Sequence, residues 1–101
     1  MLLYNITTQI DNLIANKWLL WMQQHHIPQV MATACFETYT MAKLLDVDED
    51  NVTTYTVQYK ATTMEHYTTY IDKYSATLRA ETMATWGDKC IAYRSLMEVV
   101  N

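Results

Sequence analysis

The chain has 101 residues, of which 50% are hydrophobic and 18% charged, and its formal net charge is −4. This length suits one domain with one core, and the composition excludes a disordered chain. The charge is mild and the basic residues are scattered, which argues against nucleic acid as a partner.

The first predicted element is a strand over residues 2–9, which are rich in aliphatic and β-branched side chains. Successive side chains of a strand point to opposite faces. One face is therefore expected to carry Leu2, Tyr4 and Ile6. The other face is expected to carry Leu3, Asn5 and Thr7.

A helix is predicted over residues 11–26, because apolar residues recur there at helical spacing. Asp11 or Asn12 is expected to cap its start. Pro28 lacks a backbone donor, so we predict a break or kink near residues 26–27 and a short second helix that Pro28 opens. The buried side of the long helix is expected to carry Ile14, Trp18, Trp21, Met22 and His25.

Two hypotheses are open for the histidines at the end of this helix. In one, His26 is an acid or base in a pocket beside an aromatic wall. In the other, His25 is a partly buried core residue and His26 lies at the surface or caps the helix end. Adjacent helical residues point about 100° apart, so the two imidazoles are not expected to form a metal site.

Two further strands are predicted over residues 35–45 and 52–60. Between them, the acidic segment 46–51 begins Asp-x-Asp-x-Asp, as a Ca²⁺ loop does. However, Asn51 stands where such a loop needs Gly and Val57 where it needs Glu, so we interpret the segment as a hairpin turn. The later strand is expected to present to the core Thr53, Tyr55, Val57 and Tyr59.

A second helix and a last strand complete the predicted order. Thr62 and Glu65 form a capping box that opens the helix, and Gly87 ends it. The apolar stripe of this helix comprises Met64, Tyr67, Ile71, Tyr74 and Leu78. Residues 88–100 then alternate as a strand.

Cys35 and Cys90 are the two cysteines, and each has apolar neighbours in a predicted strand. We interpret both as reduced packing residues, with a redox pair as the alternative. The N-terminus lacks the features of a signal peptide, and no apolar run is long enough to span a bilayer. We therefore predict a cytoplasmic protein without a membrane partner.

The predicted order of elements is βαββαβ, the plan of the ferredoxin-like α+β fold. We predict one such domain over residues 1–101, with both helices on one face of a four-stranded antiparallel sheet. The helices are expected to cover the face that carries Ile6, Val57 and Tyr93. The opposite face would then carry a mixed set, namely Asn5, Thr7, Thr56, Gln58, Ala92, Arg94 and Leu96. Two copies that pack such faces together would form a homodimeric α/β barrel.

Six segments, at residues 3–7, 18–22, 26–30, 44–49, 55–59 and 93–100, carry a family resemblance. In this order they resemble a small family of uncharacterised Bacteroidota domains whose members look like dimeric α/β barrels. Where members have a Gly ahead of the Phe of the second strand, this chain has Ala34-Cys35. The resemblance implies the fold and no settled activity, because the wider group includes cofactor-independent monooxygenases, isomerases, haem-degrading enzymes and ligand binders.

Three functions are open. The first is a non-catalytic homodimer that binds a small apolar or aromatic ligand without a cofactor or metal. The second is a cofactor-independent enzyme, monooxygenase- or isomerase-like, with His26 as acid–base and Arg94 or Asn5 stabilising an anionic intermediate. The third is a protein-interaction module. The candidate ligand-binding residues are Asn5, Trp18, Trp21, His26, Gln58 and Arg94, although Arg94 could instead pair with Glu98 or Glu37.

Overall fold

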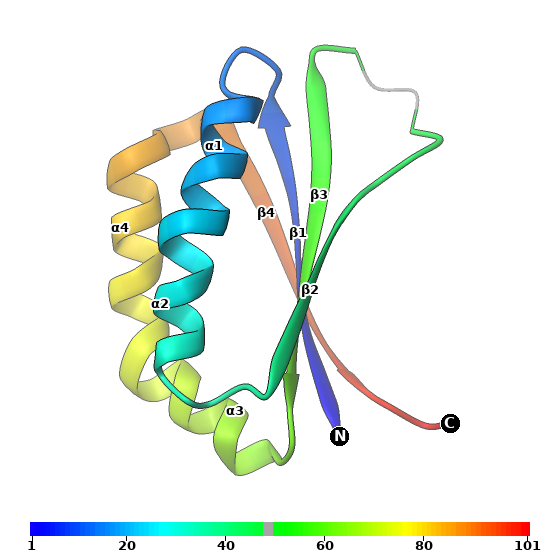
Figure 1. Ribbon diagram of the computed structural model, residues 1–101, viewed down its shortest axis with the longest axis vertical. Coiled ribbons are helices and arrows are strands. Elements are labelled where there is room, and N and C mark those ends of the chain that lie inside the picture. Colours follow the sequence, from blue (N-terminus) through cyan, green and yellow to red (C-terminus); the bar gives the residue numbers. More distant parts are fainter. Residues whose placement is uncertain (48–49) are drawn as a thin grey trace.

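The computed structural model describes residues 1–47 and 50–101 (Figure 1). Within these ranges one antiparallel sheet has the strand order β2-β3-β1-β4. Its strands are β1 (Leu2–Asp11), β2 (Thr38–Lys43), β3 (Val52–Ala61) and β4 (Cys90–Glu98). Asp48 and Glu49 of the acidic segment, on which the Ca²⁺ hypothesis depends, lie outside the described residues.

Two long helical segments lie side by side on one face of the sheet (Figure 1). The first comprises α1 (Ala15–Trp21), the π-helical turn η1 (Met22–His26) and α2 (Ile27–Ala32). The second comprises α3 (Met64–Tyr70), the π-helical turn η2 (Ile71–Ser75) and α4 (Ala76–Trp86), followed by a short 3₁₀ turn, η3 (Gly87–Lys89). The predicted ferredoxin-like βαββαβ plan is confirmed.

The register of β4 corrects one predicted face. Arg94 lies opposite Ile6 on the neighbouring strand, and Tyr93 lies opposite Thr7. Residues directly opposite one another point to the same side of a sheet. Arg94 therefore lies on the helix-covered face and Tyr93 on the open face, the reverse of the prediction. In β4 apolar residues stand at both odd-numbered and even-numbered positions. Alternation alone therefore did not define which side of this strand faces the helices.

The π-helical turn η1 changes which residues of the first helix point inward. The Ile27 N–H donates to the Met22 carbonyl, five residues back, so this turn holds more residues than an α-helical turn. A buried row with a constant spacing of four results, namely Trp18, Met22, His26 and Val30. The side chain of His25 is 47% exposed, so its predicted place on the buried side is wrong.

Of the break or kink predicted near residues 26–27, the break is absent. His26 and Ile27 keep helical φ angles of −68° and −60°. Pro28 lies in the first turn of α2, where a missing backbone donor is tolerated. The π-helical turn η1 precedes this proline, and the helical segment continues through it without interruption.

Three predicted boundaries shift by a few residues. The first helix begins at Ala15, and Asp11 instead ends β1 and accepts a hydrogen bond of 2.9 Å from the Leu13 N–H. Thr63, one residue after the predicted Thr62, caps α3. Cys35 is buried in the loop before β2 and does not lie within a strand. Both cysteines are free thiols.

The core is organised around the ring of Tyr4, which is 3% exposed. Four aromatic rings have their centroids 5.3–6.4 Å from that of Tyr4, namely Phe36, Tyr59, Tyr67 and Tyr70. They come from the loop before β2, from β3 and from α3, so this cluster joins the sheet to the second helical segment.

Ala34, in the turn between α2 and β2, adopts a left-handed φ of 62°. We expect Ala34→Gly to raise the free energy of unfolding by roughly 0.5–1 kcal/mol, because the relief of Cβ strain exceeds the added entropy of Gly in the unfolded chain. Urea denaturation would measure the change. The matched control is Ala80→Gly in α4, which should lower stability by about 1 kcal/mol. A similar loss for both variants would contradict the prediction.

Candidate ligand-binding site

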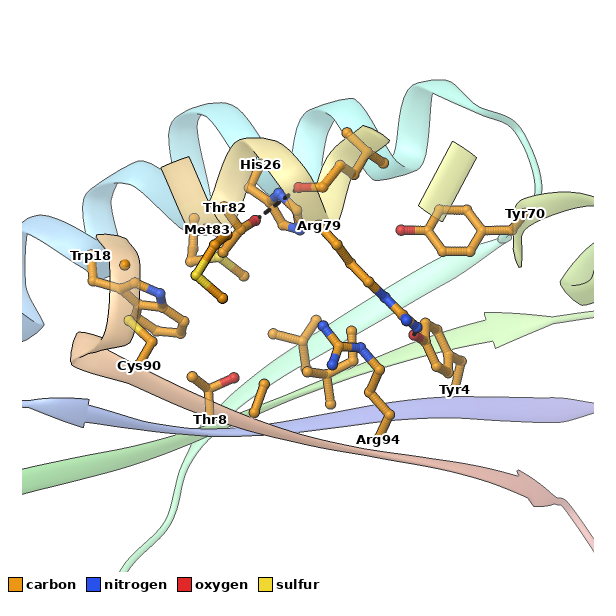
Figure 2. Close-up of a pocket in the computed structure, with 16 residues that line it drawn as sticks. Tyr4, Thr8, Trp18, His26, Tyr70, Arg79, Thr82, Met83, Cys90 and Arg94 are labelled. Carbon is orange, nitrogen blue, oxygen red and sulfur yellow. Dashed lines mark hydrogen bonds between the residues drawn. The ribbon is translucent and has the colours of Figure 1, made fainter. Parts of the chain in front are cut away.

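A cavity of about 310 Å³ lies between the helices and the covered face of the sheet (Figure 2). Much of its lining is apolar and includes Ile6, Trp18, Met22, Val57, Leu78 and Met83. Its polar side chains are Tyr4, Thr8, His26, Tyr70, Arg79, Thr82 and Arg94. The lining thus combines an apolar surface with basic and hydroxyl groups and contains no carboxylate among the described residues.

His26 enters the cavity wall from η1, above the middle of the space in Figure 2. It is 9% exposed, and its Nδ1 atom is buried without a hydrogen-bond partner among the described residues. Its ring stacks on Trp21, with the centroids 5.1 Å apart and the planes at 21°. The π-helical turn therefore supplies the cavity with an imidazole held against an indole.

Burial lowers the pKa of His26 to about 4. The carboxylate of Glu81 acts in the opposite direction, while His25 and Arg94 lower the pKa further. The imidazole is therefore neutral near pH 7, with one nitrogen that donates and one that accepts. Glu81 itself is exposed, and its Oε1 atom lies 2.5 Å from the Nε2 atom of His25.

The two arginines of the cavity differ in their partners. Arg79, from α4, donates from Nη2 to the Tyr4 hydroxyl at 3.2 Å. Arg94 rises from β4 toward the centre of the cavity (Figure 2). With the residues that the structure describes, Arg94 makes no hydrogen bond or ion pair, so the alternative pairing with Glu98 or Glu37 is not observed.

Burial raises the pKa of Tyr70 to about 12, and nearby Tyr4 adds to this effect. The positive charges of Arg79 and Arg94 oppose it without cancelling it. Tyr70 therefore keeps its proton at neutral pH and presents a hydroxyl that can donate.

The structure brings Trp18, His26 and Arg94 together at the cavity. Trp21 lies behind His26 and meets Trp86 edge-on, with their centroids 5.8 Å apart. Trp86, the last residue of α4, thus packs against the first helical segment.

Asn5 and Gln58 lie opposite each other on β1 and β3, on the open face of the sheet. They lie on the face predicted for them, and therefore these two candidate binding residues do not line the cavity between helices and sheet. Asn5 donates instead to the Thr7 hydroxyl at 3.1 Å. The covered face of β1 carries the even-numbered residues, such as Tyr4 and Ile6.

Sequence reasoning missed Arg79 and Tyr70 as cavity residues. Arg79 lies off the apolar stripe predicted for its helix, and that stripe assumed α-helical spacing throughout. The π-helical turn η2 shifts the inward positions, so that Tyr70, Ser75 and Leu78 are buried while Tyr74 is exposed. No local sequence signal that we used distinguishes this turn from an α-helix.

Residues 1–100 match the profile of a family described as a domain of unknown function, DUF4286. The chain belongs to the DUF4286 family. This confirms the prediction of an uncharacterised domain family. No curated protein matches the sequence significantly.

Solved structures with the same fold include several proteins of low sequence identity to this DUF4286 chain. A dimeric ferredoxin-like protein from an uncultured marine organism is 11% identical, with a TM-score of 0.74 over 99% of this chain and 96% of the other. A second protein of that description and source is 13% identical, with a TM-score of 0.62 over 100% and 96%. An ethyl tert-butyl ether d (ethd) family protein from Bacillus halodurans is 9% identical, with a TM-score of 0.69 over 99% and 100%. At these identities the likeness shows the fold alone.

Two absences complete the description. In residues 1–47 and 50–101, no helix has both the length and the apolar character needed to cross a membrane. Within the same ranges, no three His, Cys, Asp or Glu side chains gather in a way that could hold a metal ion.

The lowered pKa of His26 predicts a loss of stability in mild acid. In the unfolded chain His26 takes up a proton below its usual pKa of 6.5. In the folded chain it does so only below a pKa of about 4. His26 should therefore account for a loss of about 2 kcal/mol between pH 7 and pH 5. Urea denaturation at both pH values would measure this loss in the wild type and in His26→Gln, which should lack it. His66→Gln, at an exposed histidine, should keep the wild-type loss, and an unchanged loss in His26→Gln would contradict the assignment.

Proposed function

We propose that this DUF4286 protein is a non-catalytic homodimer that binds a small, largely apolar or aromatic molecule in the cavity. The observation that supports binding is the cavity itself, which is largely apolar with a few polar groups that can orient a ligand. Its volume of about 310 Å³ lies at the lower end of the range for ligand sites, which favours a small molecule. A cytoplasmic location stays a prediction, in keeping with the free thiols of Cys35 and Cys90.

The open face of the sheet supports the homodimer. On β4 it carries exposed apolar side chains, with Ile91 52% and Tyr93 61% exposed and Met97 beside them. Exposed apolar groups gathered on one surface are typical of an interface. Two copies that meet through this face would bury these groups from both sides and leave both cavities accessible on the helical sides.

A substitution on the open face tests the dimer. Tyr93→Glu should convert a dimer into a monomer at micromolar concentration, because two charges would be buried across a symmetric interface. Light scattering coupled to size-exclusion chromatography would measure the mass. Leu13→Glu is the matched control, since Leu13 is 91% exposed in the turn after β1, away from the sheet face, and this variant should remain dimeric. A monomeric wild type would reject the dimer outright.

Native mass spectrometry of the protein purified without additives tests the ligand. We expect the mass of two chains plus a small additional mass that is lost on denaturation. Ala92 lines the cavity from β4, so Ala92→Phe should fill part of the space and remove the additional mass without changing the oligomeric state. An additional mass that persists in Ala92→Phe would place the ligand elsewhere.

An enzyme that uses His26 as acid–base is the second candidate, because His26 and Arg94 line one cavity. The pKa of about 4 makes the neutral imidazole a weak base, whereas efficient general bases have pKa values near the working pH. This mismatch favours binding over proton transfer. A turnover that His26→Gln abolishes, with the melting temperature unchanged, would instead support the enzyme.

A further inference from the structure

We propose that the molecule bound in this cavity is a carboxylate attached to an apolar body of about one ring. This inference rests on the proposed binding function and narrows it to a chemical class. Its basis is the unequal distribution of polar groups along the cavity.

One end of the cavity is made of hydrogen-bond donors. Figure 2 shows Arg79, Arg94, Tyr4 and Tyr70 gathered there. The Arg79 guanidinium lies 3.2 Å from the Tyr4 oxygen, and the rings of Tyr4 and Tyr70 are 6.0 Å apart. The strand register places Arg94 opposite Ile6, two residues along β1 from Tyr4 on the same face. Four elements of secondary structure, β1, α3, α4 and β4, therefore direct donors to this part of the cavity.

These donors lack matching acceptors. A guanidinium has five N–H groups and no acceptor atom. The Tyr4 oxygen accepts from Arg79, so its own hydrogen remains available to another group. Arg94 has no hydrogen-bond or ion-pair partner among residues 1–47 and 50–101, and no Asp or Glu of that part of the chain lines the cavity. An anionic acceptor would satisfy this set.

A carboxylate suits these donors better than a spherical anion does. The planar fork of a guanidinium matches the two oxygens of a carboxylate in a bidentate pair. A hydroxyl such as that of Tyr70 can donate to a lone pair that the guanidinium leaves free. Arg94 is exposed as well as lining the cavity, so it can reach an entering ligand before the ligand is fully buried.

The other end of the cavity is mainly apolar, with the hydroxyls of Thr8 and Thr82 as its polar groups. Figure 2 shows Trp18, Met83 and Cys90 there, across the space from the arginines. The whole volume of about 310 Å³ equals roughly ten water-sized volumes of about 30 Å³ each. One ring with one carboxylate fits within such a space with its charge at the donor end and its ring against the indole.

The rest of the chain does not favour anions. Its formal net charge is −4, so long-range attraction would act against a negatively charged ligand. The nearest carboxylate that acts on His26 is Glu81, which is exposed and already bonded to His25. Selection for an anion must therefore come from the local pair of arginines, and the loss of one should be measurable.

Benzoate and its neutral analogue benzamide test the inference on the 101-residue chain. Both are titrated while the methyl resonances of Met22 and Met83, which line the cavity, are followed by NMR. We expect benzoate to shift both methyls and to bind at least tenfold more tightly than benzamide. Arg94→Met should lower benzoate affinity at least tenfold and leave benzamide affinity unchanged.

Two further variants keep the result interpretable. Arg94→Lys keeps the charge but loses the bidentate fork, so its benzoate affinity should fall between those of the wild type and Arg94→Met. Lys17→Met removes one positive charge from the exposed side of α1 and should leave both affinities unchanged. The Arg94→Lys variant also serves if Arg94→Met does not fold.

The outcomes separate this inference from the proposed function. Equal binding of benzoate and benzamide at the two methyls would overturn the carboxylate and leave the apolar binding site standing. Inorganic phosphate that displaces benzoate at equal concentration would also overturn it, because the site would then be a simple anion site. No shift of either methyl with either compound would overturn both the carboxylate and the proposed function.

Discussion

The burial of Tyr4 connects the core of this protein to its cavity. Its ring lies within an aromatic cluster that joins the central strand β1 to the second helical segment. Its hydroxyl accepts a hydrogen bond from Arg79 at one end of the cavity. A change at this residue would disturb both packing and the donor set, because one side chain serves both. The position of the cavity is thus a consequence of how the sheet packs on the helices.

The π-helical turn η1 determines which histidine lines the helical side of the cavity, here called its roof. It places His26 inward against Trp21 and leaves His25 outside, where it bonds Glu81. Removed from water, the imidazole of His26 stays neutral at pH 7, since burial lowers its pKa. The roof therefore contributes a neutral donor and acceptor, while positive charge enters only from Arg79 and Arg94.

The two faces of the sheet differ in what they carry. The covered face and its helices enclose the cavity, and the open face carries the exposed apolar side chains Ile91 and Tyr93. A ligand and a second copy of the chain would not compete for the same surface. In the proposed dimer the second copy would cover the open face of the sheet and leave the cavity on the other face uncovered.

The sequence by itself determined the order of the elements, because alternation and helical spacing are local properties of consecutive residues. It also predicted the inward face of β1, where Leu2, Tyr4 and Ile6 share one side. Only the tertiary structure decided that Arg94 faces the helices, since register depends on pairing with β1 and both sides of β4 carry apolar residues. It likewise decided that His26 and not His25 is buried, because the π-helical turn changes the helical spacing from which the prediction was made.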